Sequence, residues 1–293
     1  MAKANIPNLL GVHALVWVGN WSKDECRKAI SQSKEAGYDL IEIPALDPKS
    51  IDIEDTKKVL EEYGLKGACS LGLSRDADIN NEDPEVVARG EKKLMDALTV
   101  VEGLGGDYLG GVLYSFLGKY PKPTTQKARE NATNSLRRLA QAAKSKGITI
   151  GLEPVNRYES NLLNTGRQAL DMINAIGEDN VKVHLDIYHM NIEEQDLVSP
   201  VIECGDKLGY VHIGASHRGP LGTGNVDFDS FFGALAKINY TGVITFESFS
   251  SAVVNEELSN TLGIWRNLWT DGLAMAISSR EYMEKKIIAA HSR

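Results

Sequence analysis

The sequence predicts an α/β fold, a single (β/α)8 barrel in which eight parallel strands alternate with helices. Three observations lead to this prediction. Short apolar runs alternate with longer helical segments along the chain. Several of these runs are apolar at nearly every position, which is typical of strands covered on both faces. No proline-rich, glycine–serine or low-complexity linker interrupts the alternation, so the pattern indicates one continuous barrel.

Eight segments have the apolar composition of strands and are bounded by residues that favour turns. They are Leu9–Trp17, Leu40–Pro44, Gly67–Leu73, Tyr108–Tyr114, Ile148–Glu153, Val181–Asp186, Tyr210–Ile213 and Val243–Glu247. The first and the fourth are the least regular. Eight is the number of strands that a closed barrel of this class requires.

Residues that start and end helices lie between these strands. The predicted starts are Ser22 with Glu25, Asp83 with Pro84, Thr165 with Gln168, and Asp227, and the predicted ends are Gly37, Gly105 and Gly147. Serine, threonine and aspartate can accept a hydrogen bond from a free backbone N–H at a helix start, and glycine adopts the left-handed conformation that ends many helices. A long helix is predicted from about residue 125 to residue 146.

The whole chain, residues 1–293, is expected to form one domain, with a last helix and a helical tail from about residue 255. Barrels of this class often reach about 250 residues or more as one unit. Trp265 and Trp269 are four residues apart in the last segment. On a helix they would share one face, which could pack against the barrel or a second subunit.

Composition and charge argue against several classes of protein. The net charge is −8 and no basic stripe is present, which disfavours nucleic-acid binding. Cys26, Cys69 and Cys204 lack paired spacing, which disfavours a disulfide framework and a thiolate zinc site. The N-terminal segment lacks the features of a signal peptide, and no apolar run reaches the about 18 residues of a membrane span. A cytoplasmic protein that binds neither nucleic acid nor membrane is expected.

The last four predicted strands each end in one ionisable residue. These residues are Glu153, Asp186, His212 and Glu247. In a barrel of this class the C-terminal ends of the strands meet at one mouth. A lone buried carboxylate among apolar neighbours is costly, whereas several carboxylates can share one bound dication. The pattern therefore predicts a divalent-metal site at the mouth of the barrel.

Three carboxylates and one imidazole form a mostly hard ligand set, which suits Mn²⁺, Co²⁺ or Mg²⁺ better than a structural zinc ion. Glu153 and Glu247 belong to strands that are not neighbours, so they would reach the mouth from different sides. Two such carboxylates could remove a proton on one face of a substrate and deliver one on the other. The metal would bind adjacent oxygens of an α-hydroxyketone and stabilise the enediolate.

Four segments carry a resemblance to a known family: GLEPVNRYES, HLDIYHMNIEE, VHIGASHRGPLGTGNVDF and FESF. From Gly11 to about Phe249 the sequence resembles the ketose 3-epimerases, which include the D-tagatose, D-psicose (D-allulose) and L-ribulose 3-epimerases, within the xylose-isomerase-like TIM barrels. The resemblance implies that Glu153, Asp186, His212 and Glu247 bind one divalent metal per subunit, with Mn²⁺ expected and Co²⁺ or Mg²⁺ as alternatives. It also implies proton transfer at C3 by Glu153 and Glu247, a free ketose as substrate, and a homodimer or homotetramer.

The resemblance further implies a set of substrate-binding residues. Glu159, His189 and Arg218 match residues that hold oxygens near C1 to C3, and Trp21, Cys69 and Phe249 match residues that line the sugar pocket. Three positions depart from the best-known pattern. His13 replaces a bulky aromatic residue and is similar to the branch that prefers L-ribulose, Tyr114 stands where some relatives have tryptophan, and Ser248 stands where proline is frequent.

Some residues and functions allow other interpretations. His184 lies two residues before Asp186 and is expected to be a hydrogen-bonded histidine of the barrel core. An aldose–ketose isomerase, a hydroxypyruvate-type isomerase or a cyclic-polyol dehydratase could use the same metal site. A metal-dependent endonuclease for abasic DNA would need more metal ligands than six histidines and an acidic chain favour. A catalytically silent sugar-binding barrel is a further alternative, and the presence of both glutamates argues against it.

Overall fold

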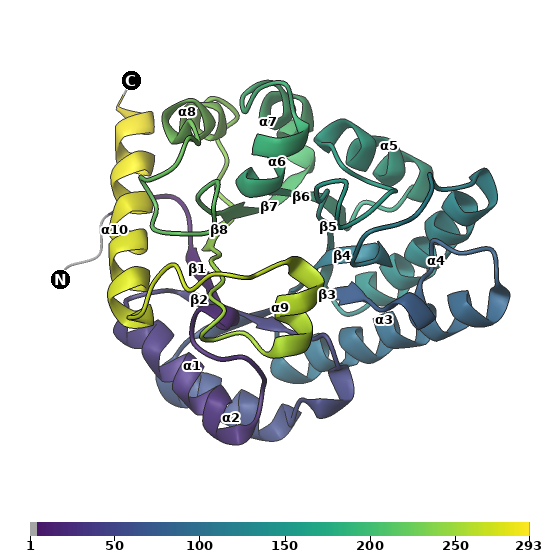
Figure 1. The fold of residues 1–293 in the computed structure, drawn as a ribbon, viewed down its shortest axis with the longest axis horizontal. Helices are drawn as coiled ribbons and strands as arrows, with labels where there is room; N and C mark the ends of the chain where they lie inside the picture. The colour runs from purple at the N-terminus through teal and green to yellow at the C-terminus, as the bar shows by residue number, and fades with distance from the viewer. Residues whose placement is uncertain (1–4, 293) are drawn as a thin grey trace.

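The computed structural model describes residues 5–292 and shows a closed barrel of eight parallel strands, ordered β1 to β8 as in the sequence (Figure 1). The barrel closes because β1 pairs with both β2 and β8. The strands are β1 Leu10–His13, β2 Leu40–Pro44, β3 Lys66–Leu73, β4 Tyr108–Phe116, β5 Thr149–Leu152, β6 Val181–Asp186, β7 Leu208–Ile213 and β8 Val243–Phe246. The predicted (β/α)8 fold is confirmed. Residues 1–4 and 293 of the predicted domain lie outside the described residues.

Helices surround the barrel and fill the connections between strands (Figure 1). They are α1 Lys23–Glu35, α2 Ile53–Tyr63, α3 Pro84–Leu104, α4 Gln126–Lys144, α5 Gly166–Ile176, α6 Ile187–Glu193, α7 Ser199–Cys204, α8 Phe228–Lys237, α9 Glu256–Leu262 and α10 Gly272–His291, with 3-10 turns at Ala14–Val16, Pro48–Ser50, Arg75–Ala77 and Gly205–Lys207. The predicted capping boxes of Ser22 with Glu25 and of Thr165 with Gln168 are both present. Within residues 5–292, none of the helices combines the length and apolar character needed to cross a membrane.

The first strand is shorter than predicted. β1 ends at His13, and the chain continues as a 3-10 turn over Ala14–Val16. The His13 ring starts this turn, because its Nδ1 accepts a hydrogen bond from the backbone N–H of Leu15 at 3.3 Å. The apolar run therefore continues beyond the strand as part of the core, and His13 takes the strand-end position.

Trp265 and Trp269 do not share a helix, so that prediction is wrong. Gly263 ends α9 with a φ of +67°, and residues 263–271 form a connection between α9 and α10. Trp269 is buried, whereas Trp265 is 71% exposed. Figure 1 shows α9 inside the ring of outer helices and α10 as a member of that ring.

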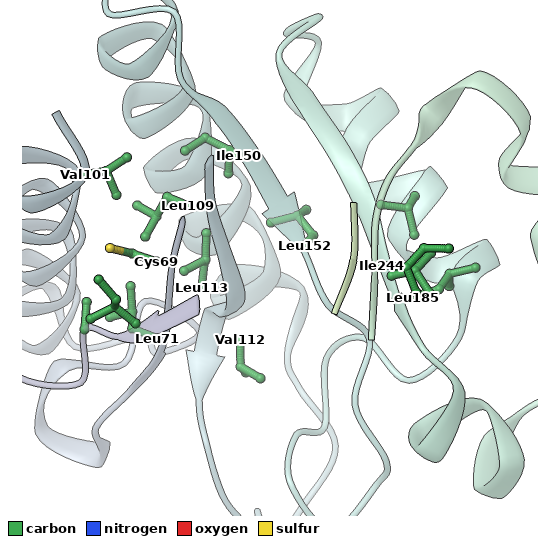
Figure 2. Packing of buried hydrophobic residues seen from close by; sticks show 14 of the residues in the cluster. Cys69, Leu71, Val101, Leu109, Val112, Leu113, Ile150, Leu152, Leu185 and Ile244 are labelled. Atoms are coloured by element: carbon green, nitrogen blue, oxygen red, sulfur yellow. The ribbon is translucent and has the colours of Figure 1, made fainter. Parts of the chain in front are cut away.

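The apolar layer between barrel and helices determines which side chains reach the barrel interior. Figure 2 shows Cys69 of β3 among Leu109, Val101 and other buried apolar side chains of this layer. Because successive residues of a strand point to opposite faces, Ser70 faces the interior instead. Ser70 accordingly contributes to the pocket described next, and Cys69 does not.

Candidate active site

A pocket opens at the C-terminal ends of the strands, where the predicted site residues were expected to meet. Eight of the predicted residues line it: His13, Glu153, Glu159, His189, His212, Arg218, Glu247 and Phe249. Leu258 and Leu262 of α9 form part of its apolar wall. Since Leu258 packs in one cluster with Leu15 and Phe249, α9 is fixed to the edge of the barrel.

Glu153 and Glu247 each follow a strand directly and stay bonded to the neighbouring strand. The backbone N–H of Glu153 donates to the carbonyl of Gly111 at 3.2 Å, and that of Glu247 donates to Ile213 at 3.0 Å. Both side chains converge on one atom, His212 Nδ1, which lies 3.3 Å from Glu153 Oε1 and 3.7 Å from Glu247 Oε2. The structure therefore brings two carboxylates and one imidazole nitrogen into a single cluster.

Glu42 of β2 orients the His212 ring, a role that the sequence analysis missed. His212 Nε2 lies 2.8 Å from Glu42 Oε2, and both side chains are buried. With its hydrogen on Nε2 and donated to Glu42, the ring directs Nδ1 at the two glutamates. Burial alone would raise the pKa of Glu42. The nearby His212 and His13 rings have the larger, opposite effect, so the pKa of Glu42 lies well below its usual value. A glutamate within the apolar strand LIEIP was the available sequence signal.

We expect Glu42→Gln to weaken divalent-metal binding about 10–100-fold, because partners that orient a metal-ligating histidine typically contribute this much. Glutamine can still accept the His212 N–H bond but removes the negative charge. Titration of the apo-protein with Mn²⁺, followed by calorimetry, measures the change. Glu102→Gln is the matched control, since Glu102 is half-exposed and pairs with Lys146. Equal affinities in the two variants would contradict this role of Glu42.

Asp186 ends β6 and begins α6, which fixes its two oxygens differently. Oδ1 accepts the backbone N–H of Tyr188 at 2.7 Å. Oδ2 is buried and has no hydrogen-bond partner among the described residues; the nearest cation is Arg218 Nη1 at 3.2 Å. Burial raises the pKa of Asp186 to about 6, against the opposing effect of Arg218. One carboxylate oxygen is thus directed into the site.

The buried groups fit a divalent cation. Ligand atoms lie within 4.8 Å of one another in three sets: Asp186 with His212 and Glu247, Glu153 with His184 and His212, and Glu153 with Asp186 and His189. His212 Nδ1 and Asp186 Oδ2 are both buried without a hydrogen-bond partner in residues 5–292, and a cation would satisfy both atoms. The sets together contain all four predicted ligands and add His184 and His189.

His189 is better placed as a hydrogen-bond donor than as a metal ligand. Its Nδ1 accepts the backbone N–H of Asn156 at 3.1 Å, so the hydrogen of the neutral ring is on Nε2. Nε2 faces Asp186 Oδ2 at 3.6 Å and Glu159 Oε2 at 4.0 Å. Asn156 also donates its side-chain amide to Glu159 Oε1 at 2.7 Å. Asn156 therefore fixes both predicted substrate contacts, and burial raises the pKa of Glu159 to about 7.

His184 lies beneath the cluster and corrects one expectation. The ring is fully buried, with its centre 4.1 Å from that of His212. Neither of its nitrogens has a hydrogen-bond partner within the described part of the chain. It is a core histidine, as expected, but it is not hydrogen-bonded to protein groups. With Glu153 and His212 it forms one of the candidate metal-binding sets.

Arg218 provides the positive charge of the site. Its Nη1 lies 2.6 Å from Glu247 Oε2, and its guanidinium stacks 3.8 Å from the centre of the Tyr188 ring.

Burial raises the pKa of Glu153 to about 7. Burial acts in the same direction on Glu247, but Arg218 and His212 outweigh it, so the pKa of Glu247 is lowered. A cation bound between the two glutamates would favour the ionised form of both.

Three predicted pocket residues lie behind the pocket wall instead of in it. Cys69 faces the helix layer, as described above. Trp21 is buried and donates its indole N–H to Thr56 at 3.1 Å. Tyr114 donates its hydroxyl to the carbonyl of Glu153 at 2.8 Å. These side chains lie behind the walls of the site and do not line the pocket.

The family described as the xylose isomerase-like TIM barrel matches residues 30–276. The chain is 52% identical over 276 residues to an L-ribulose 3-epimerase of Methylomonas sp. (strain DH-1), covering 94% of this chain and 96% of the relative. It is 47% identical over 280 residues to a ketose 3-epimerase of Arthrobacter globiformis, covering 96% and 97%. A crystal structure of a Methylomonas sp. D-allulose 3-epimerase in complex with D-allulose matches with a TM-score of 0.94, 51% identity and coverage of 98% and 99%.

The closed barrel and the carboxylate–histidine cluster at its strand ends define an α/β-barrel enzyme of the isomerase class with a candidate divalent-metal site. Within that class, the chain belongs to the ketose 3-epimerase family of xylose isomerase-like TIM barrels. The resemblance found in the sequence is thereby confirmed at the level of the family.

Proposed function

We propose that this enzyme epimerises free ketoses at C3 by removing the C3 proton on one face and returning a proton on the other. One observation carries the proposal: Glu153 and Glu247, from strands on different sides of the barrel, converge at 3.3 and 3.7 Å on one imidazole nitrogen inside the pocket. Two carboxylates at one reacting carbon provide the two proton-transfer groups that inversion requires. The family membership supports the same reaction.

The other polar groups of the pocket would bind and orient the sugar. His189 Nε2 and the Arg218 guanidinium are hydrogen-bond donors that face the cluster, and Glu159 is an acceptor beside them. The enediolate carries negative charge on adjacent oxygens, so donors fixed before the reaction stabilise it more than the substrate. The buried position of these groups strengthens this effect, because little water competes for them.

Glu153, Asp186, His212 and Glu247 would hold the metal ion, with His184 as a further group beneath them. A bound dication would supply a Lewis acid for two adjacent substrate oxygens. Mn²⁺ is the proposed ion and Co²⁺ or Mg²⁺ are alternatives, because three carboxylates form a hard ligand set.

Ketoses of the L-ribulose and D-allulose type are the proposed substrates. Relatives with these substrates in their names are 52% and 51% identical to this chain. His13 supports this choice, since it lies in the pocket wall with Nε2 3.9 Å from Glu247 Oε1. A compact polar ring at this position would leave space next to one proton-transfer group and could bond a substrate hydroxyl.

Incubation of the Mn²⁺-loaded enzyme with L-ribulose or D-fructose in D₂O tests the reaction. We expect deuterium at C3 of both epimers by NMR, with no aldose formed, because the proton is exchanged at C3 during each inversion. Label at C1 or C2 with an aldose product would instead establish an aldose–ketose isomerase. Loss of water from the substrate would establish a dehydratase.

We also propose that the protein is one domain and works in the cytoplasm as a homodimer or homotetramer. Tyr158 and Ile192 are large apolar side chains that remain exposed in the single chain, and we propose them as candidates for the subunit contact. Light scattering coupled to size-exclusion chromatography measures the subunit number. A monomer at micromolar concentration would contradict the oligomer.

A further inference from the structure

Arg218 has an unusual backbone conformation for a residue with a large side chain. Its φ is +60°, and Asn239 is the only other non-glycine residue with positive φ among the described residues. The left-handed region is unfavourable for residues with a Cβ atom. Such a conformation persists only where the surroundings hold it, and it is concentrated at functional sites.

Two side chains from another part of the chain hold the Arg218 backbone. Ser248 Oγ donates a hydrogen bond to the carbonyl oxygen of Arg218 at 2.5 Å. Trp269 Nε1 donates to Ser248 Oγ at 2.8 Å. The hydroxyl is therefore oriented by the tryptophan, which leaves its own hydrogen for Arg218. Ser248 has no exposed surface and Trp269 is buried, so water does not compete for these bonds.

The same arrangement directs the Arg218 side chain into the pocket. Its guanidinium lies beside Glu247 and Asp186 and stacks on Tyr188. Gly214 provides the space, because a Cβ atom there would lie 3.2 Å from Arg218 Nη1. Ser248 follows Glu247 directly, so its hydrogen bond couples the position of the arginine backbone to that of the glutamate.

We infer that Ser248 and Trp269 are positioning residues, which hold Arg218 in the left-handed conformation that presents its guanidinium to the substrate. The inference rests on the proposed function for the role of Arg218, but the Ser248–Arg218 contact is independent of it. The hydrogen bonds from Trp269 to Ser248 and from Ser248 to Arg218 connect the segment between α9 and α10 to the pocket, since Trp269 belongs to that segment.

Ser248→Ala and Ser250→Ala form a matched pair for the test. Ser250 is also fully buried and two residues away, but its hydroxyl donates to Asn267 instead of Arg218. We expect Ser248→Ala to raise KM for the ketose about threefold to tenfold, as the loss of one buried hydrogen bond predicts, with a smaller change in kcat. Ser250→Ala should leave KM unchanged. Ser248→Thr retains the hydroxyl and should restore KM.

Crystal structures of the two alanine variants give a readout that does not depend on turnover. In Ser248→Ala we expect Arg218 to leave the positive-φ region or its guanidinium to leave the Glu247 carboxylate, and in Ser250→Ala we expect neither. An unchanged Arg218 in Ser248→Ala, or equal KM values in the two variants, overturns the inference. If the wild-type enzyme does not epimerise ketoses, the proposed function fails, and the crystal structures still decide the role of Ser248. Trp269→Phe removes the N–H donor but keeps an aromatic ring, and it should change KM in the same direction.

Discussion

Glu247→Gln is expected to lower the rate of ketose epimerisation about 10²–10⁴-fold, the usual contribution of one positioned acid or base. Glutamine has nearly the same shape as glutamate, but it cannot accept a proton from C3. The carboxylate lies 3.7 Å from His212 Nδ1 and 2.6 Å from Arg218 Nη1, so it is held at the centre of the site. Turnover is measured by product formation, and circular dichroism shows whether the barrel remains folded.

Exchange with solvent separates proton transfer by Glu247 from a role in metal binding alone. If Glu153 and Glu247 act on opposite faces of C3, Glu247→Gln should still wash deuterium into one epimer, through Glu153, without forming the other. Glu153→Gln should instead wash deuterium into the other epimer, through Glu247. Metal content is measured in both variants. If each variant exchanges both epimers equally with metal bound, the two-glutamate mechanism is wrong.

Glu62→Gln serves as the control for these variants. Glu62 is an exposed glutamate that pairs with Arg27, so the substitution changes the net charge by the same amount without touching the site. Its kcat and KM should equal those of the wild type.

The four strand-end residues could be predicted because each interrupts the same kind of pattern. An apolar run that ends in one ionisable residue marks the C-terminal end of a barrel strand, and parallel strands bring those ends together. Strands β6 and β7 pair Asp186 with His212, so these two strand-end groups lie side by side. The barrel and the contact between these groups therefore follow from local patterns plus the closure of the sheet.

Side chains whose direction depends on the exact strand register could not be predicted in the same way. Cys69 was expected in the pocket, but Ser70 faces it, since a shift of one residue along a strand reverses the direction. Tyr114 and Trp21 also lie outside the pocket and form hydrogen bonds behind its wall. A resemblance gives positions along the chain, whereas the face of each residue depends on the pairing.

Contacts between residues far apart in the sequence could not be predicted either. Glu42 lies 170 residues from His212, and Ser248 lies 30 residues from Arg218. No local pattern relates such pairs, although the charge inside the apolar strand of Glu42 was a usable signal. The short helices α6 and α7 were also missed, because six or seven residues give too few turns for a helical period to stand out.

Removing the metal is expected to abolish turnover and to lower the melting temperature of the protein. Glu153 and Asp186 have raised pKa values because burial opposes their charge, and Glu247 keeps its charge only through Arg218 and His212. A dication that bound this cluster only in the folded protein would stabilise the fold. At 100 times the Kd the gain is about 2.7 kcal/mol, which corresponds to a rise in Tm of about 4–5 °C for a chain of 293 residues.

Dialysis against a chelator, followed by additions of Mn²⁺, Co²⁺ or Mg²⁺, measures both effects by calorimetry and by turnover. The ion that restores activity at the lowest concentration should also give the largest Tm at equal concentration, because both effects depend on binding to the same groups. Asp186→Asn provides the internal control: it removes the charge of a buried carboxylate whose Oδ2 has no other hydrogen-bond partner in the described chain, so its Tm should respond little to added metal. Full turnover in protein shown by elemental analysis to contain no metal would contradict the site, because the two glutamates would then perform the reaction without a cation between them.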